Sequence, residues 1–339
     1  MDSPFAIAYG QNSEDVVLRR ALTDVAQGFY VEVGANDPTE MSISRAFYDA
    51  GWRGIAVEPV EELAERFRRE RPRDQVVQAA ATATDVDAVT LHVFDGTGLS
   101  TLVDDISEAH RTSGFQEEPV QVPGRTLSSI LAEADTPEDI HFMVVDTEGT
   151  EADVLAGLDL TRWRPWVLVV EATRPRTSIP SHQAWEPALL EAGYEFCLFD
   201  GLSRFYVAAE HADRLRDRLS APANTFDAFT PRHWHQREQE LGATREELRH
   251  ALEELVAARV AADAAREELH EAQQELIRWR GAVLARWTEA ADGGGSVEGR
   301  PNHEVVRLRT ELAATQATLS WRITAPLRAV QSRRLRSWR

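Results

Sequence analysis

A short apolar run that breaks into a glycine-containing loop limits the fold of this chain more than any other feature. Residues 29–33, Phe-Tyr-Val-Glu-Val, predict a buried strand, and the loop over residues 34–38 begins with Gly34. A second apolar run, residues 55–57, ends in Glu58 after a spacer long enough for a helix. Doubly wound folds hold a nucleoside with this arrangement of strand, glycine loop, helix and second strand ending in an acid. We therefore predict a nucleoside-binding edge here.

The elements that follow alternate between strands and helices. Predicted strands are residues 54–58, 75–79, 142–146, 166–171, 194–199 and 204–208, and predicted helices are residues 41–52, 60–70, 126–134, 151–157 and 183–192, with Ser13 as the N-cap of an earlier helix. Residues 85–125 predict extra β structure or a lid. The alternation predicts an α/β fold with a doubly wound, mostly parallel seven-stranded sheet and an antiparallel closing strand.

Acidic residues gather where the predicted strands end. Ligands of such sheets lie beyond the carboxyl ends of the strands. The acids expected there are Glu32, Glu58, Asp146, Glu148 and Glu171. Five acids at one edge mark a cleft.

Composition excludes several classes of protein. The net charge of -19 argues against general nucleic-acid binding. All 37 basic residues are arginine, so Schiff-base and P-loop-lysine chemistry are excluded. The single cysteine, Cys197, excludes an intramolecular disulfide and fits a reducing compartment. With neither a signal-peptide pattern nor a transmembrane-length apolar run, we expect a cytoplasmic protein.

A heptad pattern begins near Arg237. Leucine, alanine or valine recurs every seven residues from Leu241 to Val283, and a series of alanines lies three residues after members of that series. The pattern predicts an α-helical coiled coil over residues 233–290. A helical hairpin and a homo-oligomer both fit it.

We expect four segments in the chain. These are a domain over residues 1–232, the coiled-coil helix over 233–290, a Gly-rich linker over 291–303, and an amphipathic helix with a basic tail over 304–339. Residues 320–339 carry six arginines, no acids, and both Trp321 and Trp338. Such a tail fits peripheral attachment to anionic lipid at the inner face of the membrane or docking to a protein such as a glycosyltransferase.

Residues 5–230 resemble the FkbM-type methyltransferase family of S-adenosylmethionine-dependent O-methyltransferases. The matching stretches are residues 11–15, 28–38, 51–59, 98–101, 146–149, 164–166 and 199–206. Two positions depart from the family pattern: Val144 replaces a common lysine, and Ser13 replaces a frequent glycine. The resemblance implies a Rossmann-like class I methyltransferase fold and S-adenosylmethionine as the cofactor.

The resemblance also implies roles for individual residues. Gly34 would let the backbone approach the cofactor, Glu32 would lie near its amino-acid portion, and Glu58 would accept hydrogen bonds from the ribose. The expected cofactor-binding residues are Gln11, Glu14, Asp15, Glu32, Gly34, Asn36, Asp37, Glu58, Pro59, Ala80 and Asp146. The candidate bases, in falling order, are Asp146, Glu148, Glu171 and His182. Asp146, Glu148 and Glu171 are alternatively ligands of Mg²⁺ or another divalent cation.

The expected reaction is methyl transfer to a hydroxyl group of a small molecule or glycan. The segment from Ser320 to Arg328 resembles tails attached to bacterial surface-polysaccharide glycosyltransferases, which favours a sugar in a polysaccharide, glycolipid or other glycan. Tailoring of a polyketide-type secondary metabolite is the alternative acceptor chemistry, and a catalytically weak scaffold in a glycan assembly complex is the non-enzymatic alternative. A nicotinamide-dependent dehydrogenase is disfavoured because the loop after Glu32 lacks the G-x-G-x-x-G spacing.

Overall fold

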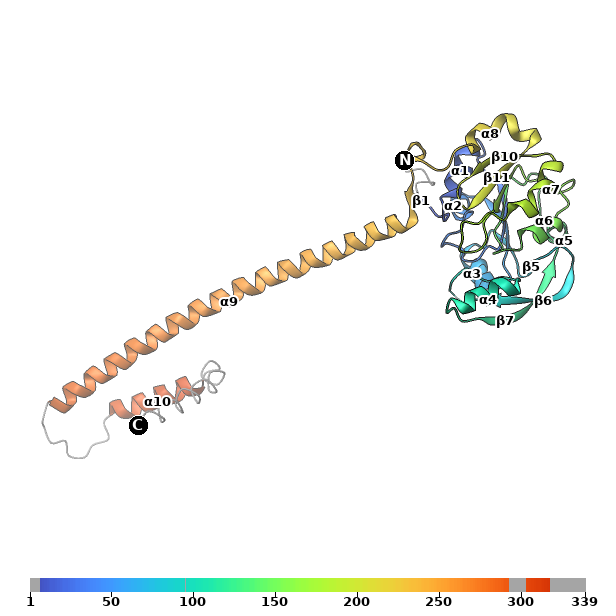
Figure 1. Cartoon of the computed structure of the whole chain (residues 1–339). Coiled ribbons are helices and arrows are strands. Elements are labelled where there is room, and N and C mark those ends of the chain that lie inside the picture. The colour runs from blue at the N-terminus through green and yellow to red at the C-terminus, as the bar shows by residue number, and fades with distance from the viewer. Residues whose placement is uncertain (1–6, 95, 293–302, 318–339) are drawn as a thin grey trace. The chain divides into compact units, whose positions relative to one another are not determined.

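The computed structural model describes residues 7–94, 96–292 and 303–317, and the chain divides into two compact units, residues 1–247 and 248–339 (Figure 1). The first unit is built around a seven-stranded sheet. Its strands are β2 (Phe29–Val33), β3 (Arg53–Val57), β4 (Gln75–Val77), β8 (Phe142–Val145), β9 (Val167–Glu171), β10 (Tyr194–Phe199) and β11 (Ser203–Ala208), in the order β10-β11-β9-β8-β2-β3-β4. β11 is antiparallel to both of its neighbours and every other pair is parallel. This sheet confirms the predicted doubly wound fold.

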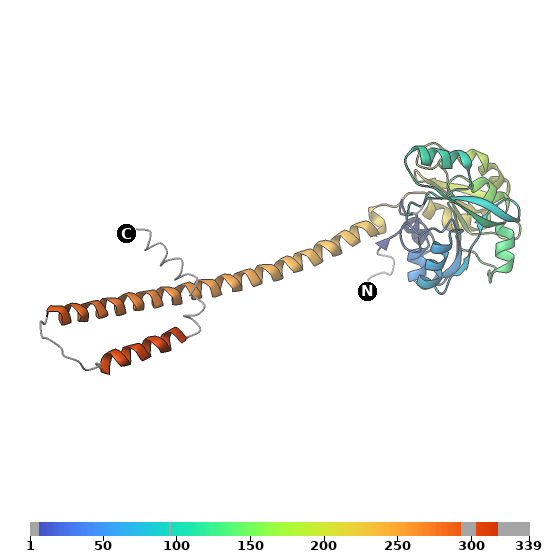
Figure 2. The same cartoon turned by 90° about the horizontal axis from the view of Figure 1, so that it is seen from below.

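Helices cover both faces of this sheet (Figures 1 and 2). They are α1 (Glu14–Ala21), α2 (Arg45–Asp49), α3 (Glu61–Glu70), α5 (Leu127–Glu133), α6 (Glu151–Ala156), α7 (Glu186–Glu191) and α8 (Ala212–Leu219). Successive side chains of a strand point to opposite faces. Val31 of β2 accordingly packs in the core that holds α5, α6 and α7, whereas Tyr30 packs in the core that holds α1, α2 and α8.

A separate three-stranded sheet accounts for the unusual segment at residues 85–125. It consists of β5 (Ala80–Ala81), β6 (Val86–Val93) and β7 (Glu118–Arg125), in the order β5-β7-β6, and α4 (Asp104–Thr112) lies between β6 and β7 along the chain. The extra β structure expected there is confirmed. The remaining short elements are β1 (Ile7–Ala8), β12 (Thr230–Pro231), η1 (His182–Ala184), η2 (Ala209–His211) and η3 (Thr225–Asp227).

One predicted helix start is wrong, and another lies where it was predicted but lacks a side-chain cap. The helix expected over residues 41–52 is reduced to α2, because Ser42 and Ser44 turn inward to hydrogen-bond Glu32. Ser13 occupies the N-cap position of α1 but its side chain caps nothing, and its φ of 62° is left-handed. Glycine adopts that backbone conformation without steric cost, so a glycine would suit the position that Ser13 occupies.

The C-terminal part is helical where it is described. α9 spans Arg232–Asp292 and α10 spans His303–Ala317. Most of the predicted linker and the whole basic tail from residue 320 lie outside the described residues, and the expected segment boundaries and the coiled coil stay predictions. Among the described helices, none combines the length and the apolar character that crossing a bilayer would require.

Candidate active site

A cavity of about 620 Å³ opens at the carboxyl ends of β2, β3, β8 and β9. Its lining includes most of the residues that the sequence singled out: Gln11, Glu14, Glu32, Gly34, Asn36, Glu58, Pro59, Ala80, Asp146, Glu148 and Glu171. Its volume is in the range of small-molecule sites in proteins. The predicted cleft is therefore present at the predicted sheet edge.

Gly34 lets two strand ends meet at the centre of this cavity. Its φ is +74°, and a Cβ at this position would lie 1.8 Å from the backbone oxygen of Asp146. No side chain fits in such a gap. Gly34 thus keeps the loop after β2 against the end of β8, where Asp146 begins the next loop.

Glu58 is fixed by two backbone donors. Its Oε2 accepts a hydrogen bond from Asn36 N–H at 2.7 Å, and its Oε1 accepts one from Val60 N–H at 2.8 Å. Burial raises the pKa of Glu58 to about 7, against the lowering effect of these two bonds. Each carboxylate oxygen keeps a second lone pair for a ligand hydroxyl.

Glu32 is held by a buried arginine that was not among the residues predicted from the sequence. Arg71 has no exposed surface; its Nη1 lies 3.8 Å from Glu32 Oε2 and donates to Ser44 Oγ at 2.6 Å. Ser42 Oγ donates to Glu32 Oε2 at 3.1 Å. Val144, which replaces the family lysine, is paired with Glu32 across β2 and β8. The positive charge beside Glu32 therefore comes from Arg71.

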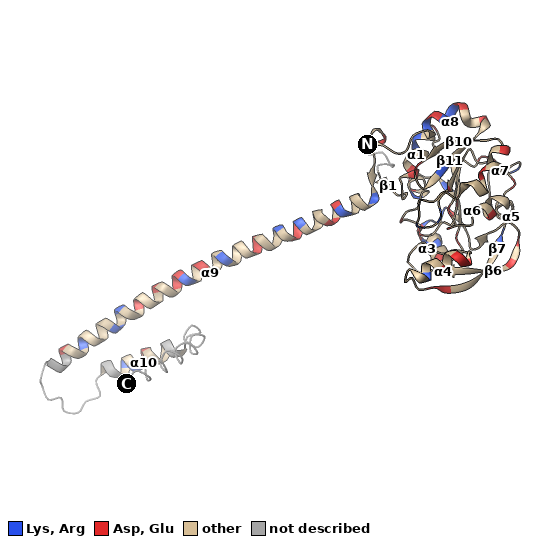
Figure 3. Cartoon of the chain, viewed as in Figure 1, with Lys and Arg blue, Asp and Glu red and all other residues tan. Residues whose placement is uncertain are grey.

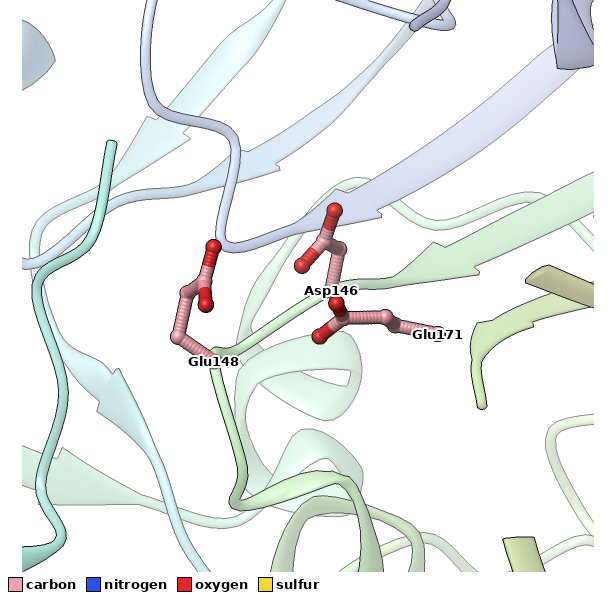
Figure 4. Close-up of side chains that lie close together, drawn as sticks. All are labelled: Asp146, Glu148 and Glu171. Atoms are coloured by element: carbon pink, nitrogen blue, oxygen red, sulfur yellow. The ribbon is translucent and has the colours of Figure 1, made fainter. Parts of the chain in front are cut away.

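Asp146, Glu148 and Glu171 form a compact carboxylate cluster (Figure 4). One carboxylate oxygen from each of the three lies within 4.8 Å of the others. One oxygen of Glu148 and one of Glu171 are buried without a hydrogen-bond partner among the described residues. Burial, together with repulsion from neighbouring carboxylates, raises the pKa of all three groups.

The loop after β8 is strained where it presents Glu148. This residue has a φ of 51°, which is uncommon for a non-glycine residue. Its carbonyl accepts a hydrogen bond from Thr101 Oγ1 at 2.8 Å, and Glu151 Oε1 accepts from the N–H groups of Thr147 and Gly149 at 3.1 and 3.0 Å. Such strain is common at functional sites, where neighbouring contacts enforce it.

A further acid lies at another part of the cavity wall. Glu14, at the start of α1, accepts a hydrogen bond from Asn12 N–H at 2.9 Å. Burial, with a smaller contribution from the charge of Asp200, raises its pKa to about 8. One oxygen of Asp200 is also buried without a partner among the described residues.

Three predicted site residues do not line the cavity. Asp15 accepts hydrogen bonds from the N–H groups of Tyr9 and Gly10, and Asp37 pairs with Arg66 at 2.6 Å, so both anchor loops. His182 begins η1, with its Nε2 3.8 Å from a carboxylate oxygen of Glu186. The structure gives these three no position beside the carboxylate cluster.

Several lining residues were not anticipated. They are Met41, Thr97, Thr147, Thr173, Arg176, Thr177 and Ser178, among others. Arg176 is the sole basic side chain of the lining formed by the described residues, and its guanidinium stacks over Phe115 at 4.8 Å. Loops that pack over a strand end carry no periodic signal, so only the tertiary structure identifies them.

Comparison with known proteins bears on residues 32–196, which match the model of the methyltransferase FkbM domain family. The solved methyltransferase FkbM from Methylobacillus flagellatus KT is 15% identical with a TM-score of 0.34, covering 54% of this chain and 44% of its own. A precorrin-6y C5,15-methyltransferase from Geobacter metallireducens GS-15 is 12% identical with a TM-score of 0.31, covering 58% of this chain and 87% of its own.

The present chain thus spans less than half the length of the solved FkbM protein. No curated protein matches it. The family model begins at the end of β2, covers β3 through β9 and extends into β10, the part of the sheet whose strand ends carry the cavity. Residues 32–196 of this chain, just under half of its length, thus form a region similar to the FkbM methyltransferase domain family.

Proposed function

We propose that this protein is an S-adenosylmethionine-dependent O-methyltransferase that modifies a sugar hydroxyl in a surface polysaccharide, glycolipid or other glycan. One observation carries the proposal. Three carboxyl groups with raised pKa values, Asp146, Glu148 and Glu171, open on the same cavity as the strand-end acid Glu58. One cavity thus offers both a cofactor-holding acid and proton acceptors.

The residues present fit the cofactor that the family implies. When bound, S-adenosylmethionine supplies a methyl group on a positively charged sulfur. Glu58 has free lone pairs for ribose hydroxyls, and Glu32 offers negative charge for an ammonium group. Glu148 and Glu171, each with one unpartnered oxygen, line the same cavity and favour a cationic ligand.

The cluster would remove the proton of the acceptor hydroxyl. A general base works best when its pKa lies near the operating pH. Burial has raised the pKa values of Asp146 and Glu148 toward neutral pH. We assign the base to Asp146, which directly follows β8 and lies against the Gly34 loop. Glu171 shares a hydrogen bond with Asp146 and keeps its carboxylate in place.

The glycan part of the proposal rests on two features. Hydroxyl side chains of Thr97, Ser100, Thr177 and Ser178 line the cavity and offer hydrogen bonds to a polyol. The tail from Ser320 resembles those of polysaccharide glycosyltransferases. Both features favour a sugar over an apolar secondary metabolite.

The test is transfer of labelled methyl groups from S-adenosylmethionine to a panel of saccharide and polyketide acceptors. We expect methyl ethers on saccharides and a thermal shift with the cofactor alone. Asp146→Asn should bind the cofactor but lose turnover. Unchanged turnover in that variant would remove Asp146 as the base, and exclusive methylation of polyketides would overturn the glycan assignment.

A divalent cation is the competing use of the same three carboxylates. Oxygen ligands at this spacing suit Mg²⁺, which would acidify a sugar hydroxyl in place of a protein base. We expect activity to survive exhaustive chelation, because Asp146 is assigned as the base. Loss of activity with EDTA, restored by Mg²⁺, would replace the proton-acceptor role by a metal-ligand role.

A further inference from the structure

One face of α9 carries apolar side chains that no described residue covers. Leu248, Leu255, Leu269 and Leu276 lie on a seven-residue repeat whose middle position is Ala262, and the leucines are 62, 67, 53 and 52% exposed. α9 has 61 residues and is therefore about 90 Å long. Helices gain most of their stability from packing of an apolar face, so this seam requires a partner.

Over the residues that the structure describes, α10 is too short to cover the seam. α10 has 15 residues, which corresponds to roughly 22 Å. The seam from Leu248 to Leu276 extends over roughly 42 Å at the same rise per residue. At least half of these leucines would stay in water with α10 as the sole partner.

We propose that the seam binds a second copy of this chain as a parallel two-stranded coiled coil. The four leucines occupy position a of the heptad, and Ala251, Ala258, Ala265 and Ala272 occupy position d. In such a coil each a or d side chain inserts between four residues of the facing helix. Alanine at d allows the two helices to approach closely, which suits two strands.

Charges beside the seam decide the orientation. Position g carries Glu254, Glu268 and Glu275, and position e carries Arg259, Arg266 and Arg280. In a parallel coil, position g faces position e of the following heptad in the other helix. Glu254 then meets Arg259 of the second copy, and Glu275 meets Arg280 of the second copy. No pair of like charges faces across the seam over residues 247–287.

In an antiparallel coil, like charges would face each other across the seam. Position g then faces g, and e faces e, so glutamates oppose glutamates and arginines oppose arginines. Figure 3 shows acidic and basic residues distributed along the coloured part of α9. Within the described residues, Glu254, Arg259, Glu275 and Arg280 form no ion pair inside the chain, so they remain available to a second copy.

The first experiment measures the mass of the full chain by sedimentation velocity at micromolar concentration. We expect twice the chain mass of 37.9 kDa. The double variant Leu255→Asp, Leu269→Asp should sediment as a monomer, whereas Val256→Asp, Val260→Asp, on exposed positions outside the seam, should stay dimeric. A monomeric or trimeric wild type would overturn the proposal, and so would a dimeric seam variant.

The second experiment fixes the orientation by disulfide trapping. In a Cys197→Ser background, Ala258→Cys places a thiol at a d position, opposite itself only in a parallel, in-register coil. We expect rapid cross-linking on mild oxidation, and none for Val260→Cys, which lies outside the seam. Equal, slow cross-linking of both variants would overturn the parallel arrangement.

A charge exchange tests the pairing itself. Glu254→Arg, Glu275→Arg makes both flanks basic, and Arg259→Glu, Arg280→Glu makes both flanks acidic. Each variant alone should dissociate at about tenfold higher concentration, and an equimolar mixture should form heterodimers. If the two variants did not form heterodimers in preference to homodimers, the proposed charge pairing would be overturned. Unchanged thermal shift with S-adenosylmethionine in every variant shows that residues 1–232 still fold.

Discussion

The cavity contains two sets of carboxylates that differ in their hydrogen bonds. We call Glu32 and Glu58 the closed carboxylates, because both oxygens of each accept hydrogen bonds from within the protein. We call Asp146, Glu148 and Glu171 the open carboxylates, because Glu148 and Glu171 each keep a buried oxygen without a partner in the described chain. All five residues line the cavity, but only the closed set is held on both oxygens by the protein itself.

This difference separates stability from function. A buried polar atom without a partner costs free energy, commonly 1–3 kcal/mol. Proteins retain such atoms where a ligand or a reaction uses them. Removing the buried partners of a closed carboxylate should therefore lower the free energy of unfolding, whereas removing an open one should stop the reaction and leave the fold intact.

The largest effect is expected from Asp146→Asn. Loss of a positioned general base typically lowers kcat by 10²- to 10⁴-fold. The amide keeps the size of the side chain, so cofactor affinity should change little. Single-turnover kinetics and calorimetry measure the two quantities, with exposed Asp153→Asn of α6 as the control. Parallel losses of affinity and kcat would assign Asp146 to binding instead.

Arg71→Met tests the closed set through its buried cation. Arg71 lies within 4 Å of Glu32 and Asp74, and stacks on Phe67. Methionine fills similar space but leaves both acids without this partner, which typically costs 3–5 kcal/mol. Chemical denaturation measures the free energy of unfolding. Exposed Arg69→Met is the control, and a loss below 1 kcal/mol would contradict the proposed role.

Glu58→Gln compares binding with stability at a closed carboxylate. The amide keeps one acceptor oxygen but turns donors toward a backbone N–H and toward the ligand. We expect 10- to 100-fold weaker binding of S-adenosylmethionine, the range that one or two hydrogen bonds to a charged group provide. Calorimetry measures the affinity. Unchanged affinity would show that Glu58 serves the loop alone.

Stability should also depend on pH. Burial raises the pKa of Glu58 from 4.5 to about 7 and that of Glu14 from 4.5 to about 8, so the folded chain binds these protons more tightly than the unfolded chain. The contribution of these two groups to the free energy of unfolding then falls as pH rises above 4.5, by up to about 1.4 kcal/mol per unit for each group, and levels off above pH 8.

Denaturation curves between pH 5 and 9 measure this slope. Glu58→Gln should make the fall in the free energy of unfolding less steep below pH 7. The fall between pH 7 and 8 should remain. Stability that rises across this whole interval would show that other groups dominate.

The smallest effect is expected from Glu171→Gln. Its carboxyl group is repelled by Asp146 and Glu148, and the amide can still donate a hydrogen bond to Asp146. We expect the variant to be about 1 kcal/mol more stable and less active. Thermal denaturation at pH 8 and a turnover assay measure both. A less stable variant would place Glu171 among the closed carboxylates.

Much of the site followed from local sequence. The strand-end position of Glu32, Glu58, Asp146 and Glu171 was predictable because apolar runs define strands, and parallel strands end at one edge. The late start of α2 and the missing side-chain cap at Ser13 could not be predicted for the same reason. Ser42 and Ser44 bind Glu32, and Ser13 adopts a left-handed backbone, and neither event leaves a trace in hydrophobic periodicity.

The sequence by itself determined the doubly wound fold, the acidic sheet edge and the heptad seam of α9, because each depends on the spacing of residue types along the chain. Only the tertiary structure decided which acids are closed and which are open. Arg71 reaches Glu32 across 39 positions of sequence, and Asp146, Glu148 and Glu171 meet from two strand ends. The hydrogen bonds and repulsion that set their roles depend on distances in space, which spacing in sequence does not fix.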